Sequence, residues 1–461
     1  MCSSDLIVRA EVQKLKAQAF SAPADQYNRL ITSLGFVLTQ AQQRVASEVA
    51  DDLMQNQPSL RLIQGDVGSG KTVIAALAAV QACESNLQAA IMAPTELLAE
   101  QHFTNFSNWL NPIGIRTAWL SGRVTGKKRQ AELDHIRSGD TPVVIGTHAL
   151  FQKEVQFNNL GLVIIDEQHR FGVNQRLALR EKGADDNTAP HQLVMTATPI
   201  PRTLSMSVYA DMDVSIIDEL PPGRKPVLTT VMSDEKRDAV IARVAEACEA
   251  GRQAYWVCTL IEESEVLQCQ AAEATATELG ELLPDIRIGL VHGRMNAAAK
   301  TSVMNEFKSG TIDLLVATTV IEVGVDVPNA SLMVMENSER LGLAQLHQLR
   351  GRVGRGSEAS HCVLMYKKPL GRLGRERLEV MRQSNDGFFI AERDLEIRGP
   401  GELLGTRQSG SLQFRIADLM RDEAMLEEVR HTSLNLMQTD RSTCERLVQR
   451  WIRDPEKIGQ V

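Results

Sequence analysis

Short apolar runs, each followed by a helical pattern of apolar and polar positions, recur along the chain. The first half contains such runs at 60–64, 89–93, 143–146, 162–165 and 192–195, and the second half at 254–258, 288–292, 314–317, 332–336 and 361–366. Unbroken apolar runs are typical of parallel strands that are buried on both faces, and the helices between them complete βαβ units. The pattern predicts an α/β fold with two tandem parallel sheets flanked by helices.

A proline-rich stretch, Pro221–Pro226, interrupts this pattern and predicts a linker between two domains. We expect a first domain at 35–222 and a second at 223–385. A C-terminal helical and loop element should follow at 386–461, where the strand pattern fades and glycines accumulate. Residues 1–34 are polar with a helical pattern, which favours either a linker or the end of a further domain.

The chain has 461 residues, of which 43% are apolar and 23% charged, as in ordinary soluble globular proteins. Its N-terminus lacks the apolar core of a signal peptide, and its longest apolar run, Val73–Val80, is too short to span a bilayer. None of the seven cysteines forms a CxxC pair, so neither a zinc ribbon nor a disulfide framework is indicated. We expect a cytoplasmic protein with reduced, mostly buried thiols and no membrane partner.

The charge distribution is uneven. A formal net charge of −8 argues against a basic surface over the whole chain. Between Arg340 and Arg415, however, there are 14 lysines and arginines and 8 aspartates and glutamates, a local excess of +6 (14 − 8). This segment fits a face that binds nucleic-acid phosphates, and it fits a solvated basic surface equally well.

The segment Gly65-Asp66-Val67-Gly68-Ser69-Gly70-Lys71-Thr72 has the spacing of a phosphate loop, between an apolar run and an apolar helical stretch. Its glycines allow backbone N–H groups to point at phosphate oxygens, which the following helix N-terminus also attracts. Lys71 would reach the β- and γ-phosphates of a nucleotide, and Thr72 would offer its hydroxyl to Mg²⁺. A chance glycine-rich turn is the weaker alternative, because a strand and a helix both flank the segment.

Asp166 and Glu167 follow the apolar run 162–165, at the end of a strand where ligands of parallel sheets bind. Asp166 would hold Mg²⁺, and Glu167 would orient or deprotonate the attacking water. In isolation the pair could be a solvated turn. A phosphate loop earlier in the same domain favours the catalytic interpretation.

The order of several motifs resembles that of superfamily 2 helicases, which implies two tandem RecA-like domains. Asp166-Glu167-Gln168-His169 is similar to their DExH box. The stretch 36–42 is similar to their adenine-reading Q motif, with Gln42 as the implied base contact. Further similar stretches are 93–101 (motif Ia), 146–148 (motif Ib), 196–199 (motif III), 317–326 (motif V) and 348–355 (motif VI).

Within that superfamily, the stretches 166–176, 195–204, 291–295, 318–330 and 344–356 are similar to the RecG family, which shares this core with transcription-repair coupling factors. The tail 384–410 is similar to the translocation motif of both, and its form is closer to RecG. The resemblance covers residues 35–461. RecG proteins also carry an N-terminal wedge domain with an OB-type fold that engages the fork junction. We expect this chain to hold the motor domains and tail without that wedge.

The resemblance implies ATP and Mg²⁺ as cofactors and assigns roles to residues in both halves of the chain. Arg352 and Arg355 are implied as arginine fingers, Gln348 as a further catalytic residue, and Gly324 and Asp326 as nucleotide contacts. The implied DNA-binding and coupling residues are Pro94, Thr95, Thr147, His148, Arg294, Thr319, Arg377, Arg398 and Gln408.

Alternative roles stay open for some residues. Arg350, Arg352 and Arg355 also fit a patch that binds the phosphate backbone, and His148 and His169 also fit packing or interdomain hydrogen bonding. Arg393 and Arg398 could form ion pairs with Glu392, Asp394 or Glu396.

The motifs together predict an ATP-dependent DNA helicase and double-stranded DNA translocase that acts on branched DNA. Fork regression, Holliday junction processing, recombination and repair are the implied processes. The alternatives are a general duplex translocase of the coupling-factor kind, a nucleotide-gated binding module without turnover, and an RNA helicase. We expect branched or duplex DNA and a single-stranded-DNA-binding protein as partners, and a monomeric chain.

Overall fold

A computed structural model describes residues 15–122, 126–167, 188–201, 212–221, 224–259, 265–322, 327–356, 358–398 and 421–440, and positions 442, 443, 446 and 450. The described residues form two compact units. The first unit draws on Met1–Gly65, Ser69–Glu219 and Pro400–Val461, and the second on Asp66–Gly68 and Leu220–Gly399.

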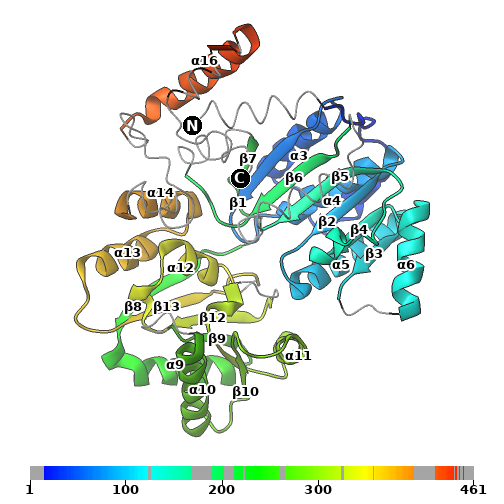
Figure 1. The fold of residues 1–461 in the computed structure, drawn as a ribbon. Coiled ribbons are helices and arrows are strands. Elements are labelled where there is room, and N and C mark those ends of the chain that lie inside the picture. The colour runs from blue at the N-terminus through cyan, green and yellow to red at the C-terminus, as the bar shows by residue number, and fades with distance from the viewer. Residues whose placement is uncertain are drawn as a thin grey trace. The chain divides into compact units, whose positions relative to one another are not determined.

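The first unit contains a seven-stranded, all-parallel sheet in the order β3-β4-β2-β5-β6-β1-β7 (Figure 1). Its strands are β1 (Leu60–Gly65), β2 (Gln88–Met92), β3 (Thr117–Leu120), β4 (Val143–Gly146), β5 (Leu160–Asp166), β6 (His191–Thr196) and β7 (Asp213–Ile217). Its α-helices are α2 (Asp25–Ser33), α3 (Gln40–Leu53), α4 (Lys71–Glu84), α5 (Glu96–Leu110), α6 (Gly126–Ser138) and, near the C-terminus, α16 (Leu426–Thr439). Short 3-10 helices are η1 (Asn111–Ile113), η2 (His148–Phe151) and η7 (Glu423–Met425).

The central strands of this sheet are buried on both faces. In β2, Ala89 and Ile91 pack into a core with α3, α4 and α5, whereas Ala90 and Met92 pack into a second core with α6. Because successive strand residues point to opposite faces, a strand covered on both sides is apolar at nearly every position. The unbroken apolar runs of the sequence follow from this double coverage.

The second unit contains a six-stranded, all-parallel sheet in the order β10-β11-β9-β12-β13-β8 (Figure 1). Its strands are β8 (Leu228–Ser233), β9 (Gln253–Val257), β10 (Ile288–Val291), β11 (Leu314–Ala317), β12 (Ala330–Met335) and β13 (His361–Tyr366). Its α-helices are α9 (Arg237–Glu249), α10 (Glu265–Leu282), α11 (Ala297–Lys308), α12 (Leu343–Arg350), α13 (Arg372–Gln383) and α14 (Gly387–Arg398). Its 3-10 helices are η4 (Asp234–Lys236), η5 (Thr319–Glu322) and η6 (Ser338–Arg340).

The two sheets share one strand order, apart from the seventh strand of the first. They also share a local device. Gln88 begins β2 and donates through Nε2 to the carbonyls of Ile136 and Thr141, both at 2.9 Å. Gln253 begins the corresponding strand β9 and donates to the carbonyl of Ile312 at 2.7 Å, and also to that of Phe307. In each unit, a buried glutamine amide thus donates hydrogen bonds to backbone carbonyls that precede the neighbouring strand.

The predicted fold class is confirmed, and each of the ten predicted apolar runs coincides with a strand. The sequence analysis missed β3, β7 and β8. All three are edge strands, and their residues are only partly buried. Because an edge strand contacts solvent along one side, it does not need an unbroken apolar run.

The described part of the N-terminal segment packs into the first unit. Phe20, Tyr27, Leu30 and Leu34 belong to the same core as α3 and α4. The helix α2 has no side-chain cap of its own at Ala24.

Glu84, at the end of α4, caps α2 in place of a local side chain. Its carboxylate accepts from the backbone N–H groups of Ala24 (2.9 Å), Gln26 (2.7 Å) and Tyr27 (3.1 Å). A carboxylate at a helix N-terminus satisfies otherwise unpaired donors and complements the helix dipole.

Replacing Glu84 by alanine should therefore detach α2. We expect the free energy of unfolding to fall by about 1–2 kcal/mol, with faster amide exchange in α2 measured by hydrogen–deuterium exchange. The matched control Glu154→Ala removes a carboxylate that is 61% exposed and should change neither quantity. Unchanged exchange in α2 of Glu84→Ala would show that the cap is not needed.

Two sequence-based expectations concern cysteines and membranes. The five cysteines within the described residues are all unpaired, and four of them are buried; they are Cys83, Cys248, Cys258, Cys269 and Cys362. Among the described residues, no helix combines the length and apolar composition that crossing a membrane requires.

Candidate functional site

The phosphate loop leads from β1 into α4. Gly68 (φ 80°) and Gly70 (φ 91°) both have left-handed backbone conformations, which glycine adopts without steric cost. Lys71 is the first residue of α4, so the loop ends at a helix N-terminus. The backbone N–H groups of such a loop and helix start can bind phosphate oxygens.

Gln42 holds this loop from α3. Its side-chain Nε2 donates to the carbonyl of Ser69 at 2.8 Å, and its Oε1 accepts from the N–H of Thr39 at 2.9 Å. A Cβ atom at Gly70 would lie 2.2 Å from the Gln42 amide nitrogen. Gly70 is therefore required both for its backbone conformation and for this close approach, while the base contact of Gln42 stays a prediction.

Lys71 and Asp166 bring opposite charges to the carboxyl ends of β1 and β5. The Lys71 side chain is buried and donates through Nζ to the carbonyl of Gly65 at 2.6 Å. Burial alone would raise the pKa of Asp166, but a hydrogen bond from His102, the charges of His102 and Lys71, and the N–H of Glu167 together lower it. The Asp166 carboxylate is therefore ionised.

The carboxylate of Asp166 has a partner at each oxygen. His102 Nε2 lies 2.7 Å from Oδ2, and the N–H of Glu167 donates to Oδ1 at 3.0 Å. Glu167 itself adopts a left-handed backbone (φ 54°), a conformation that costs a non-glycine residue about 1 kcal/mol. The sequence analysis missed His102. Its only signal was a histidine directly after motif Ia, about two turns into the helix α5 that begins within that motif.

The residues at this end of the sheet fit a magnesium ion. An ionised aspartate is the oxygen ligand that Mg²⁺ prefers, and Thr72, the second residue of α4, would add a hydroxyl. The assignment of Asp166 and Thr72 as metal ligands remains a prediction that these observations support.

The predicted DNA contacts differ in how accessible they are. Thr95 is the N-cap of α5, and its hydroxyl accepts from the N–H of Leu98 at 3.3 Å. The Thr147 side chain is only 2% exposed, whereas His148 and Arg294 are exposed. Of these, His148 and Arg294 are the side chains that solvent can reach most freely. Pro94 and Thr319 are half-buried.

The motif VI residues lie on α12 and the loop after it. Gln348 and Arg352 are buried, and Arg355 donates through Nε to the carbonyl of Gly351 at 3.1 Å. These contacts order the segment that carries the predicted arginine fingers.

Arg350 has a structural position within the second unit. It is 2% exposed, and burial lowers the pKa of its guanidinium. One nitrogen donates to the carbonyls of Met381 and Ser384, both at 2.8 Å, and to the hydroxyl of Thr229 at 3.3 Å. The other nitrogen donates to Nδ1 of His347 at 3.1 Å. Arg350 is therefore not available for a surface phosphate-binding patch.

Substitution of Arg350 by methionine should leave these buried oxygens without their donor. We expect the second unit to lose about 3 kcal/mol of stability, measured by thermal unfolding, while the folded protein keeps its DNA affinity. Arg294→Met provides the opposite case, because this exposed side chain should affect DNA affinity and not stability. Weaker DNA binding by Arg350→Met at unchanged stability would restore the patch interpretation.

Arg377 and Arg398 converge on the start of α12. Arg377 donates to the carbonyls of Glu339 (2.9 Å) and Leu341 (3.0 Å). Burial and the nearby Arg398 lower the pKa of Arg377. A Cβ atom at Gly342, the N-cap of α12, would lie 2.1 Å from a guanidinium nitrogen of Arg398. Two predicted coupling residues thus lie at one end of the helix whose other end is Arg350.

The ion pairs considered from the sequence also form in α14. Arg398 donates to Asp394 at 3.0 Å, and Arg393 pairs with Glu396. The Arg393 pair is exposed and contributes little to stability, whereas the Arg398 pair joins a partly exposed guanidinium to the buried Asp394. Neither pair excludes a coupling role for Arg398.

Several predicted residues lie outside the described part of the chain. They are Gln168, His169, Gly324, Asp326 and Gln408.

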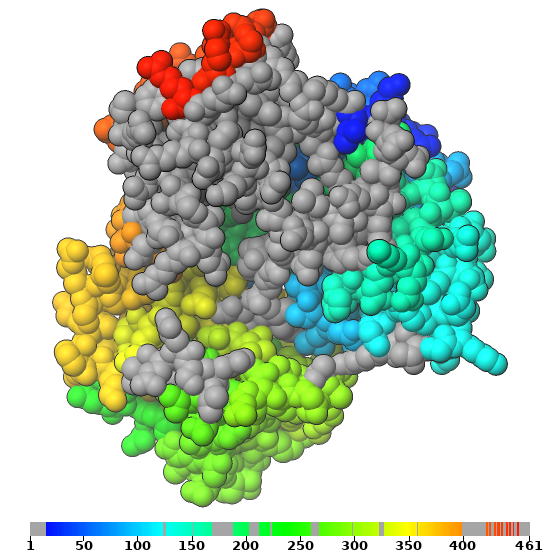
Figure 2. Space-filling view, viewed as in Figure 1, coloured from blue at the N-terminus to red at the C-terminus, as the bar shows by residue number. Residues whose placement is uncertain are grey.

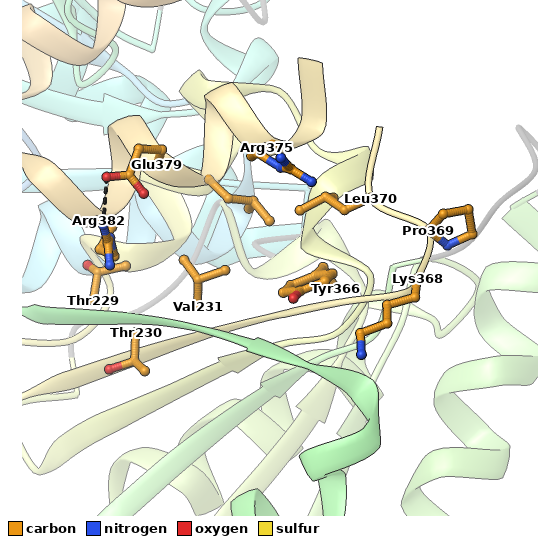
Figure 3. Close-up of a pocket in the computed structure, with 11 residues that line it drawn as sticks. Thr229, Thr230, Val231, Tyr366, Lys368, Pro369, Leu370, Arg375, Glu379 and Arg382 are labelled. Carbon is orange, nitrogen blue, oxygen red and sulfur yellow. Dashed lines mark hydrogen bonds and ion pairs between the residues drawn. The ribbon is translucent and has the colours of Figure 1, made fainter. Parts of the chain in front are cut away.

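A pocket of 1080 Å³ lies between the edge strand β8, the end of β13 and α13. Figure 3 shows side chains of α13 facing those of β8 across it, and α13 lies on the visible surface of the second unit (Figure 2). Arg382 pairs with Glu379 at 2.8 Å, and Lys368 with Glu235 at 2.7 Å, so two of its three cations are neutralised. None of the predicted site residues lines this pocket.

Comparison with known families agrees with this geometry. Residues 39–207 match the DEAD/DEAH box helicase family, and residues 234–357 match the helicase conserved C-terminal domain. Residues 384–450 match the C-terminal part of domain 3 of ATP-dependent DNA helicase RecG. Two RecA-like units, the first with a phosphate loop and an aspartate–glutamate pair at its strand ends, are the domains that superfamily 2 helicases share.

Individual relatives narrow the class. The chain is 59% identical over 450 residues to ATP-dependent DNA helicase RecG of Pasteurella multocida, covering 97% of this chain and 65% of that protein. It is 59% identical over 457 residues to RecG of Escherichia coli strain K12, covering 99% and 66%. A structure of RecG bound to a three-way DNA junction matches with a TM-score of 0.77 and 41% identity, covering 92% of this chain and 55% of that one.

The chain belongs to the RecG family, as the motifs predicted. It spans 65% to 66% of the length of these two curated relatives.

Proposed function

We propose that this chain is a DNA-dependent ATPase that translocates on double-stranded DNA and acts on branched DNA, in fork regression, Holliday junction processing, recombination and repair. The observation that carries the proposal is the phosphate loop with Lys71 and the ionised Asp166 at one end of the first sheet. Membership of the RecG family and the similarity to RecG bound to a three-way junction support the choice of substrate.

In this proposal, the first unit binds ATP. Backbone N–H groups of the loop and the ammonium of Lys71 hold the phosphates, exchanging the Lys71 bond to the Gly65 carbonyl for phosphate oxygens. Thr72 and Asp166 would hold Mg²⁺, which when bound neutralises charge on the phosphate oxygens. Glu167 orients the attacking water and accepts its proton.

The second unit supplies Arg352 and Arg355 to stabilise charge on the γ-phosphate in the transition state, with Gln348 beside them on motif VI. Arginine fingers typically accelerate such reactions by about 10³–10⁵-fold. Gly324 and Asp326, in motif V, are proposed as further nucleotide contacts.

Coupling of hydrolysis to movement is proposed to pass through α12. Arg377 and Arg398 contact the chain at its start, and motif VI follows its end. Gln408 is the third proposed member of this set. The proposed DNA contacts, Pro94, Thr95, Thr147, His148, Arg294 and Thr319, would bind phosphates without reading bases. A single-stranded-DNA-binding protein as partner, a monomeric state and a cytoplasmic location complete the proposal.

The proposal is tested by ATP hydrolysis without DNA, with linear duplex and with a three-way junction. We expect hydrolysis to be stimulated by linear duplex DNA and by the three-way junction. Glu167→Gln should lower kcat by about 10²–10⁴-fold while ATP still binds, because it removes the base; the exposed Glu154→Gln serves as control. Absence of DNA-stimulated hydrolysis at saturating ATP would favour a nucleotide-gated binding module. An equal response to duplex and junction would favour a general duplex translocase.

The glycines at two helix starts offer a matched test of coupling. Gly342 and Gly371 are N-caps of α12 and α13 with nearly the same backbone conformation. A methyl group at Gly342 would displace the guanidinium of Arg398, whereas one at Gly371 meets nothing within 4 Å. Gly342→Ala should keep DNA-stimulated hydrolysis and lower triplex displacement by about tenfold, while Gly371→Ala should behave as wild type.

If Gly342→Ala displaces a triplex at the wild-type rate, Arg398 does not couple hydrolysis to movement through α12. Equal losses in both alanine variants would indicate a general effect of capping and would count against the same assignment.

A further inference from the structure

We infer that His102 is a positioning residue for Asp166, through which α5 transmits the state of the DNA-binding side of the first unit to the metal-binding carboxylate. The inference rests on the proposed function and assigns a role to a residue outside the helicase motifs considered above.

The contact itself is short and mostly shielded from solvent. The side chains of His102 and Asp166 are 7% and 14% exposed, and His102 Nε2 lies 2.7 Å from Oδ2 of Asp166. Because Oδ1 accepts from the N–H of Glu167, the two contacts together fix the plane of the carboxylate. A ligand whose plane is fixed presents its lone pairs to a metal in one direction.

Packing alone does not explain a histidine at this position. Nδ1 of His102 is buried and has no hydrogen-bond partner among the described residues. The ring meets Phe106 edge-on, with centroids 6.4 Å apart. A buried polar nitrogen without a partner is unfavourable compared with an apolar side chain of similar size, so the contact with Asp166 is the feature that a histidine supplies here.

The helix α5 is one continuous helix that is anchored on β3. Phe103 stacks on Trp119 with ring centroids 6.0 Å apart, and the hydroxyl of Ser107 lies 2.7 Å from that of Thr117. Trp119 and Thr117 both belong to β3, so the helix packs directly on this edge strand.

The start of α5 is the place where DNA is proposed to act. Thr95 caps the helix, and Glu96 accepts from the N–H of Gly122 at 2.9 Å. His102 lies about 10 Å further along the helix axis. A phosphate bound at the helix start would therefore shift His102 with the helix and reorient Asp166. This gives DNA a route to the magnesium site that does not pass through the second unit.

The test measures metal binding directly. Mn²⁺ replaces Mg²⁺, and its dissociation constant is measured by electron paramagnetic resonance in the presence of ADP, with and without linear duplex DNA. Three variants of the full chain are compared with wild type. His102→Gln keeps an amide nitrogen at the same number of bonds as Nε2, His102→Asn carries the same amide one methylene shorter, and His102→Leu removes the donor.

We expect His102→Asn and His102→Leu to raise the Mn²⁺ dissociation constant by about tenfold and to abolish the effect of DNA on it. The variant His102→Gln should keep most of the wild-type Mn²⁺ affinity and most of its response to DNA. ADP affinity without metal should stay unchanged in all three. The control His135→Leu removes another histidine that contacts an aspartate, Asp140 at 3.4 Å on the surface, and should have no effect. Melting temperatures report whether each variant folds.

Wild-type Mn²⁺ binding in folded His102→Leu or His102→Asn would overturn the inference, and so would a Gln variant as impaired as the Asn variant. If His102→Leu does not fold, the comparison of His102→Gln with His102→Asn tests the inference by itself. Failure of the proposed function appears separately, as wild-type hydrolysis that does not respond to DNA.

Discussion

The charges of the buried Lys71 and the partly buried Asp166 are the constraint on which the first unit depends. A charge removed from water is tolerated only with partners, and each of these groups has them. Lys71 donates to the carbonyl of Gly65. The carboxylate of Asp166 accepts from the N–H of Glu167 and forms a second hydrogen bond with Nε2 of His102. The parallel sheet makes this possible, because it delivers loop ends from distant parts of the sequence to one edge.

The fold and the phosphate loop could be predicted because their signals are local. Strands covered on both faces are apolar at most positions, and the loop is encoded in eight consecutive residues, Gly65–Thr72. The edge strands β3, β7 and β8 escaped prediction because one side of each contacts solvent. The burial of Phe20 could not be predicted for another reason: the core that covers it includes α3 and α4, which lie later in the chain.

Residue roles that depend on tertiary contacts could not be predicted. Arg350 and Arg355 occur in one motif, yet the guanidinium of Arg350 donates hydrogen bonds to the carbonyls of Met381 and Ser384. No spacing rule distinguishes a buried structural arginine from a finger, because the difference lies in an element thirty residues away. The same holds for His102 on α5, because its partner Asp166 lies at the end of the strand β5. Family membership supports the motor interpretation, and side-chain contacts decide how individual residues serve it.

The central proposal is that the first unit binds the nucleotide phosphates and that arginines of the second unit accelerate hydrolysis. The most direct measurement is single-turnover hydrolysis of ATP by Arg355→Ala, with ATP affinity measured separately in the presence of Mg²⁺ and DNA. The account predicts near wild-type ATP affinity and a hydrolysis rate lowered by about 10³-fold or more. A wild-type hydrolysis rate in this variant would contradict it.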